Sequence, residues 1–400
     1  MRVPSPTTPE IRSWQRTPLL TQHHYRFTRL LSSFFIVLPQ IPLVFLSSIL
    51  HLPYYGRSHW SFKYRAGIFI GSHIVWALNP GTQPRKDVLS FPARSAIPKL
   101  ASGQHAQLEV IPPADENWIQ GDAQFPGMNS ESCPCFWQWT DGVTSPLHDE
   151  RPVPERKIMM YFVGGGMVQG HPLSSSLSWR TIPKTGVPIF GVNFRKCVTS
   201  KTAFPGALQD AISAFSFLLE RGYRAENISI MGDSGGGGIA ITFLLYLNKQ
   251  QFPMPENAIL VSPFVDLISK FDGKGEGEED EGKLIDLDFM NNAMLGMVGY
   301  QYCENRPELR GTLLSPARGN LSGGYTFEGL CRSMVVWGDA EAFGPGVHKF
   351  AKHLRNANVK VETLIGKDEV HDYPMLSKAD GPDEFFGRVG KFLEGDGLYE

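Results

Sequence analysis

The stretch Ile228-Ser-Ile-Met-Gly-Asp-Ser-Gly-Gly-Gly-Gly-Ile-Ala-Ile241 decides the fold, because a β-branched run passes through glycines into an apolar segment. It predicts a strand, a tight turn and a helix that continues to about Lys249. Its centre, Gly232-Asp-Ser-Gly-Gly236, fits the G-x-S-x-G pattern of a strained strand-to-helix turn that exposes a serine hydroxyl. Small neighbours let the backbones pass, and the positive end of the following helix would face any anion formed beside Ser234.

The pattern has two other readings. One is a glycine-rich turn ahead of a buried helix, without chemistry. The other is the G-D-S-G-G that surrounds the nucleophile of trypsin-like proteases. Those proteases carry the serine late in a β-barrel, whereas a long α/β region follows Ser234 here, and we therefore reject that class.

The composition limits which classes of fold, partner and metal site fit this chain. A chain of 400 residues with 42% hydrophobic content favours one large α/β domain with appendages. The formal net charge of -2 gives no electrostatic footprint for nucleic acid. Five cysteines are too few for a disulfide scaffold, and Cys133-Pro-Cys135 has no second pair at zinc spacing. We expect no metal and no organic cofactor, and the sequence indicates no oligomeric state.

The N-terminal region predicts a membrane attachment. Residues 1–29 are rich in Pro, Thr and Arg and are expected to form a disordered tail. Residues 30–52 are long enough to cross a bilayer and carry no formal charge, which predicts a membrane anchor. Pro39 and Pro42 make a kinked span or a shallow hairpin possible, and a buried cap helix is the alternative. The excess of arginines before this segment favours a cytosolic N-terminus and a luminal main domain.

The rest of the chain divides into a cap or linker region over residues 53–106 and a catalytic domain over residues 107–400. In that domain strands and amphipathic helices alternate, which predicts a mainly parallel sheet with functional groups at the carboxyl ends of its strands. The acidic, glycine-rich tract 272–286 is expected to be a solvated surface loop. Expected strands are 107–112, 157–163, 187–194, 228–231, 258–262, 334–337 and 359–365, and expected helices include 205–221, 346–356 and 382–393.

A serine nucleophile needs a base, an acid that orients the base, and donors for the oxyanion. Gly164-Gly165-Gly166 follows an expected strand, so its backbone N–H groups are candidate donors. His371 lies in the loop after the last expected strand and is the candidate base. The strand before it ends in Gly338-Asp339-Ala-Glu341, and at this point either carboxylate could be the acid.

Four segments in this order resemble the hormone-sensitive lipase and arylacetamide deacetylase branch of the α/β-hydrolases, the α/β-hydrolase fold-3 family. They are Tyr161-Phe-Val-Gly-Gly-Gly166, Phe204-Pro-Gly-Ala-Leu-Gln-Asp210, Gly232-Asp-Ser-Gly-Gly236 and the region from Gly338 to His371. The resemblance implies an α/β-hydrolase fold over residues about 155 to 395. It assigns the oxyanion N–H groups to Gly165, Gly166 and Gly235.

The family acid precedes the leucine of a Leu-Arg pair by 13 residues, and this spacing from Leu354-Arg355 implies Glu341 rather than Asp339. The family His-Gly-Phe motif corresponds to His371-Asp372-Tyr373. Val163 replaces the histidine that opens the family's glycine loop, which removes a bracing side chain but no oxyanion donor, so activity is expected to survive.

These observations predict a serine hydrolase that cleaves carboxylic esters of hydrophobic substrates, with short acyl groups such as acetyl, through Ser234, His371 and Glu341. The resemblance to deacetylases and fungal steryl acetyl hydrolases implies a membrane lipid partner and a single-pass location in the endoplasmic reticulum. Alternatives are an amidase or acyltransferase with the same triad, or a catalytically silent hydrolase-like binding protein.

Overall fold

The computed structural model describes residues 19–52, 56–57, 59–78, 99–197, 199–268, 288–290, 292–376 and 381–396. Its centre is a sheet of eight strands in the order β1-β2-β4-β3-β5-β6-β7-β8. The predicted tract 272–286 lies outside the described residues. The strands are β1 (Gln104–Ile111), β2 (Cys133–Thr140), β3 (Ile158–Phe162), β4 (Ile189–Val192), β5 (Ile228–Asp233), β6 (Asn257–Val261), β7 (Arg332–Gly338) and β8 (Val361–Gly366).

The prediction of a mainly parallel sheet is confirmed. β3 through β8 pair in parallel, whereas β2 pairs antiparallel with both β1 and β4. All five residues of β3 and all six of β5 are buried, as expected of central strands covered on both faces. The seven expected strands are present, and β2 is a strand that the sequence analysis did not anticipate.

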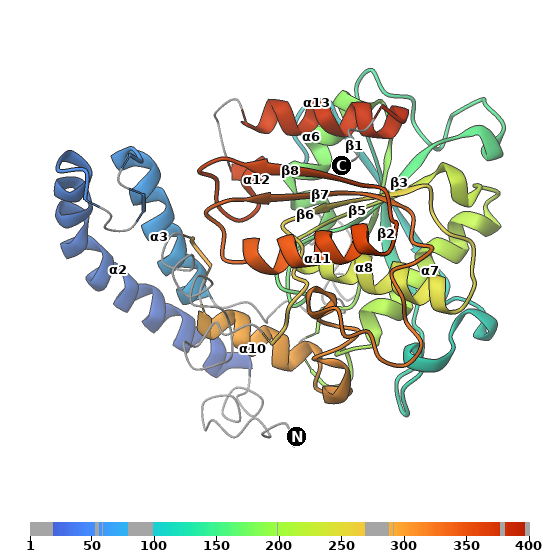
Figure 1. Ribbon diagram of the computed structural model, residues 1–400, viewed down its shortest axis with the longest axis horizontal. Coiled ribbons are helices and arrows are strands. Elements are labelled where there is room, and N and C mark those ends of the chain that lie inside the picture. Colours follow the sequence, from blue (N-terminus) through green and yellow to red (C-terminus); the bar gives the residue numbers. More distant parts are fainter. Residues whose placement is uncertain are drawn as a thin grey trace.

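Helices cover both faces of this sheet (Figure 1). α6 (Ser176–Thr185) packs against α13 (Gly381–Glu394) on one face, with the short α12 (Tyr373–Leu376) beside them. α7 (Gly206–Glu220), α8 (Ser234–Lys249) and α11 (Gly344–Asn356) cover the other face. This three-layer arrangement buries the apolar side chains of the sheet and brings the carboxyl ends of the parallel strands to one edge.

The N-terminal region forms a pair of helices outside this core. α2 (Leu19–Ile49) and α3 (Phe62–Leu78) pack against each other at one side of the molecule, near α10 (Asn292–Tyr302) (Figure 1). α2 begins at Leu19, inside the segment expected to be a disordered tail. The four prolines of that segment all lie before Leu19, so the sequence after Pro18 permits a helix to begin earlier than expected.

The expected membrane anchor needs correction. Within the described part of the chain, no helix is long and apolar enough to span a bilayer. The single-pass anchor expected over residues 30–52 is therefore not shown, and Pro39 and Pro42 lie within the helix that contains this segment. Both prolines lie inside one continuous helix, α2, so residues 30–52 alone do not form the shallow hairpin considered above. Instead, α2 forms a helical hairpin together with α3.

The α2–α3 pair is attached to the catalytic domain through partly buried polar contacts of the linker between the two helices. Arg65 is fully buried and donates from Nη1 to the carbonyl oxygen of Leu52 at 2.6 Å and from Nη2 to that of Arg57 at 2.7 Å. Arg57 in turn donates to the carbonyl oxygen of Asp339 at 3.0 Å and pairs with Asp368. The linker between α2 and α3 is therefore fixed to the two loops that follow β7 and β8.

Candidate active site

Ser234 lies at the junction of β5 and α8, where the backbone turns from strand to helix. Its φ angle is 48°, a left-handed value that is uncommon for a residue with a side chain. A Cβ atom on Gly236 would lie 2.1 Å from the carbonyl oxygen of Phe162, and one on Gly232 would lie 2.6 Å from that of Gly236. The glycines are thus required by the close approach of α8 to the ends of β3 and β5, as the pattern predicted.

His371 is the residue that the structure brings to this serine. Its Nε2 lies 2.9 Å from the Ser234 Oγ, within hydrogen-bond distance. The imidazole is only 2% exposed, and the rings of Phe343 and Phe289 pack edge-on against it at 4.6 and 5.9 Å between centroids. These apolar rings limit the orientations of the imidazole and keep it directed at the serine.

Glu341 is the carboxylate behind the other nitrogen of this ring. Its Oε1 lies 4.0 Å from the His371 Nδ1, and the side chain is completely buried. Its Oε2 accepts hydrogen bonds from the Ser262 hydroxyl at 2.6 Å and from the Gly338 N–H at 3.0 Å. The separation of 4.0 Å is longer than a hydrogen bond, and such contacts in unliganded enzymes commonly tighten when the substrate binds.

Asp339, the other carboxylate of this loop, has a different environment. It pairs with Arg57 at 3.2 Å and accepts a hydrogen bond from the Asp368 N–H at 2.7 Å. Its side chain is 35% exposed. The structure therefore uses Asp339 to attach the N-terminal helices and places Glu341 beside the histidine.

The glycine loop after β3 lies against the elbow. A Cβ atom on Gly235 would be 2.9 Å from both N and Cα of Gly166, so the two segments are in direct contact. Gly165 and Gly166 have φ angles of 106° and 60°, which turn this backbone in a way that favours glycine. Among the described residues, no hydrogen bond is donated by the N–H of Gly165 or Gly166 to another part of the protein.

Asp233, which precedes the serine, holds this loop in place. Its Oδ2 accepts the N–H of Gly164 at 2.9 Å, and its Oδ1 accepts the hydroxyl of Tyr161. Burial, together with the charge of Asp372, raises the pKa of Asp233. In the sequence Asp233 occupies only a variable position of the motif, and its bonding partners lie about 70 residues away.

The structure adds two more carboxylates that sequence reasoning missed. Asp288 is buried and accepts the N–H of Ala342 at 2.9 Å, and burial raises its pKa to about 7. Asp372 Oδ2 lies 3.2 Å from the His371 Nε2. The position of Asp372 next to the candidate base was a signal that could have identified it, whereas no local pattern marks Asp288.

These charges act on His371, the candidate base. Burial disfavours the protonated imidazole, but the carboxylates of Asp372 and Glu341 outweigh that effect and raise the pKa of His371 well above its ordinary value. A raised pKa means that the neutral form, which can accept the serine proton, becomes abundant only as the pH increases.

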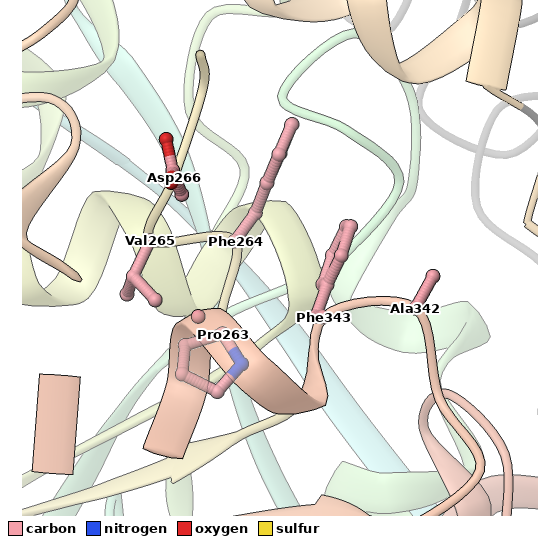
Figure 2. Close-up of a pocket in the computed structure, with 7 residues that line it drawn as sticks. Pro263, Phe264, Val265, Asp266, Ala342 and Phe343 are labelled. Carbon is pink, nitrogen blue, oxygen red and sulfur yellow. The ribbon is translucent and has the colours of Figure 1, made fainter. Parts of the chain in front are cut away.

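A small pocket is lined by residues of the loop after β6 and of the segment at the start of α11 (Figure 2). Pro263, Phe264 and Phe343 contribute to its wall, and the Phe264 and Phe343 rings are stacked with centroids 4.7 Å apart. Phe343 also contacts His371, and the N–H of Phe264 donates to the carbonyl oxygen of Ser234 at 2.8 Å. The surroundings of the serine and histidine are thus largely apolar on this side.

Comparisons with known proteins show which fold and family the chain shares. A family model described as the alpha/beta hydrolase fold matches residues 159–375. An acetyl-hydrolase of Streptomyces hygroscopicus is 26% identical over 251 residues, which cover 60% of this chain and 78% of that protein.

Solved structures also resemble the chain. A hormone-sensitive lipase from a metagenome library has a TM-score of 0.58 at 24% identity, covering 75% of this chain and 88% of its own. An esterase from the bacterial hormone-sensitive lipase family has a TM-score of 0.59 at 18% identity, covering 90% of this chain and 98% of its own. At these identities the likeness shows a shared fold.

Proposed function

The chain belongs to the α/β-hydrolase fold-3 family and is a carboxylic ester hydrolase, and from that premise we propose that it cleaves hydrophobic esters with short acyl groups through Ser234, His371 and Glu341. The observation that carries this proposal is the 2.9 Å contact between Ser234 Oγ and His371 Nε2 at a strained strand-to-helix turn. A serine becomes a useful nucleophile when a base lies within hydrogen-bond reach.

In the proposed reaction, the Ser234 Oγ attacks the ester carbonyl carbon while His371 Nε2 takes the hydroxyl proton. The tetrahedral intermediate collapses, the C–O bond to the alcohol breaks, and His371 returns the proton to the leaving alcohol. Water then attacks the acyl-enzyme with His371 as the base, which releases the acid and restores Ser234. Glu341 stabilises the imidazolium that forms in both halves of the reaction.

The oxyanion of each intermediate would be held by the N–H groups of Gly165, Gly166 and Gly235. Support comes from the contact of Gly235 with Gly166 and from the absence, within the described residues, of protein acceptors for the first two amides. Donors that are fixed before the reaction stabilise developing charge without reorganisation. Gly164, anchored on Asp233, would keep these amides in place.

Two observations support a short acyl group. A Cβ atom on Gly166 would lie 3.1 Å from Cγ1 of Val298, so α10 limits the space beside the proposed oxyanion donors. The relative from Streptomyces hygroscopicus carries the name acetyl-hydrolase. The apolar rings of Phe264, Phe289 and Phe343 favour a hydrophobic substrate.

We therefore expect kcat/KM to be at least about tenfold higher for p-nitrophenyl acetate than for the decanoate, since even one misfitted methylene in a pocket costs about 1 to 3 kcal/mol. A series of p-nitrophenyl esters from acetate to decanoate measures this ratio, and p-nitroacetanilide tests the amidase alternative in the same assay. A preference for the decanoate would contradict the short-acyl proposal. Failure of Ser234 to react with a fluorophosphonate probe would favour a catalytically silent binding protein.

We also propose that the enzyme associates with membrane lipid, at the endoplasmic reticulum, through α2. Residues 30–52 carry no formal charge. Their exposed side chains include Phe34 at 56%, Phe35 at 66% and Leu38 at 58%. Val44 and Ser47 on the same helix are buried, so α2 has an inner face and a separate apolar face directed at solvent. A helix with such a face binds at a lipid surface without spanning it.

Replacing Phe34, Phe35 and Leu38 together by serine should weaken liposome binding about 100-fold, because each half-exposed side chain contributes about 1 kcal/mol on transfer to lipid. Flotation of the full-length protein with phosphatidylcholine vesicles measures the bound fraction. Ile365→Ser is a matched control, since Ile365 is 49% exposed on β8 and lies far from α2 in sequence. Equal flotation of the triple variant and the wild type would exclude α2 as the lipid-binding surface.

A further inference from the structure

Asp372 has a backbone conformation that calls for an explanation. Its φ angle is 53°, in the left-handed region where glycine is the default residue. Aspartate tolerates this region better than most side chains, but it is still uncommon there. Asp372 is also only 7% exposed, and burial of a carboxylate is costly unless the charge is compensated. Unfavourable features of this kind concentrate where a residue has a functional role.

The contacts of Asp372 show where its charge is compensated. Its Oδ2 lies 3.2 Å from the His371 Nε2, the same nitrogen that lies 2.9 Å from the Ser234 Oγ. Its N–H donates to the Ser262 hydroxyl oxygen at 3.0 Å, and that hydroxyl donates to Glu341 Oε2 at 2.6 Å. The backbone of Asp372 is therefore fixed, and one carboxylate lies at each end of the imidazole ring.

The remaining groups around the ring are also acidic or apolar. Asp288 approaches from the segment before α10 and Asp233 from the end of β5; both interact electrostatically with His371. Tyr161 lies behind Asp233 and donates its hydroxyl to that carboxylate. Phe289 and Phe343 pack on the ring itself. Asp372 is thus the carboxylate in contact with Nε2.

Only a protonated Nε2 benefits from such a contact. A neutral imidazole that donates Nδ1–H towards Glu341 presents a lone pair at Nε2, and this lone pair would be repelled by the carboxylate of Asp372. In the imidazolium both nitrogens donate, so Glu341 and Asp372 can each accept one N–H.

We propose that Asp372 is a positioning residue that binds the Nε2–H of protonated His371 in the resting enzyme and competes with Ser234 for the base. This inference rests on the proposed function of Ser234 and His371. As the pH rises, His371 releases the Nε2 proton to solvent, and the lone pair becomes free to accept the Ser234 hydroxyl proton. Asp372 therefore sets the pH at which the enzyme becomes active.

The test is the pH profile of kcat/KM for p-nitrophenyl acetate, measured from about pH 5 to pH 10. For the wild type we expect the midpoint of the acidic limb to lie above the ordinary histidine value of about 6.5. Asp372→Asn and Asp372→Gly should each lower that midpoint by about one pH unit or more, since an opposite charge in contact shifts a pKa by about that much. At pH values above the acidic limb, kcat/KM of each variant should differ from that of the wild type by less than about tenfold.

Asp368→Gly is the matched control. Asp368 lies on the same loop with a φ angle of 61°, but its carboxylate pairs with Arg57 and not with His371. Its replacement removes a charge and relieves the same backbone conformation, so the midpoint should stay at the wild-type value. An equal shift in this variant would assign the effect to the loop and overturn the role of Asp372.

A second measurement does not depend on activity. The imidazole signals of His371 in a long-range ¹H–¹⁵N NMR spectrum are assigned by their loss in His371→Gln, and their titration midpoint should fall in both Asp372 variants. Unchanged midpoints, or a wild-type midpoint at or below the ordinary value, would overturn the proposal even if the variants fold poorly. Absence of both hydrolysis and fluorophosphonate labelling in the wild type would instead reject the proposed function, while the NMR titration still decides on Asp372.

Discussion

Ser234→Ala is expected to lower kcat for p-nitrophenyl acetate by about 10⁶-fold while the protein stays folded, because removal of the nucleophile of a triad leaves only binding and oxyanion stabilisation. Ser234 is 4% exposed and makes its close side-chain contact with His371, so loss of one hydroxyl should leave the packing intact. Single-turnover and steady-state hydrolysis by the purified variant measure the loss, and circular dichroism with thermal unfolding verifies the fold.

Ser229→Ala is the appropriate control for this change. Ser229 is 5% exposed and lies on the same strand, β5, before the turn. The same loss of a hydroxyl from the same strand should leave kcat within about threefold of the wild type, as expected of a substitution outside the reacting groups. Hydrolysis by Ser234→Ala at near the wild-type rate would reject Ser234 as the nucleophile.

His371→Ala should cause nearly the same loss, and the double variant with Ser234→Ala should be no worse than either single one. Triad members act as a unit, so their effects are not additive. Additive losses would indicate that Ser234 and His371 act in separate steps, despite their 2.9 Å contact.

Much of the central fold could be predicted because its elements carry their information locally. Strands β3 to β7 are short, largely buried and largely apolar runs bounded by turn residues. The helix after Ser234 follows directly from the glycines and apolar residues of its own segment. β2 was not predicted, because its own sequence carries little information of this local kind. Its sequence Cys-Pro-Cys-Phe-Trp-Gln-Trp-Thr contains a proline near the start and no clear alternation, and it becomes a strand through antiparallel pairing with β1 and β4.

The candidate site also contains some residues that local patterns could place and others that they could not. Ser234, His371 and the glycine loop could be placed from the order of strands, because the carboxyl ends of parallel strands converge at one edge. The surroundings that modify these residues depend on distant partners. Arg57 is 282 residues from Asp339 in sequence, and Asp288 is 54 residues from the Ala342 N–H that it accepts. No local pattern encodes such pairs, so the roles of Asp288 and Arg57 became visible only in three dimensions.

Glu341→Gln is expected to lower kcat by about 10⁴-fold, the order of loss caused by neutralising the carboxylate that orients a catalytic histidine. Glu341 is completely buried, and its Oε2 is already committed to the Ser262 hydroxyl and the Gly338 N–H. Its Oε1 is the oxygen nearest to His371 Nδ1, at 4.0 Å. Glutamine preserves the shape of the side chain but removes the charge that stabilises the imidazolium, so the effect should appear in kcat more than in KM.

Asp339→Asn tests whether Asp339, the other carboxylate of the same loop, acts as the acid instead of Glu341. Asp339 is 35% exposed and paired with Arg57, so its loss should weaken the attachment of the N-terminal helices and change kcat by less than about tenfold. Kinetics with p-nitrophenyl acetate, together with the thermal midpoint of each variant, distinguish the two effects. If Asp339→Asn abolished turnover and Glu341→Gln were mild, the acid would have to be reassigned to Asp339, with the loop after β7 rearranged on substrate binding.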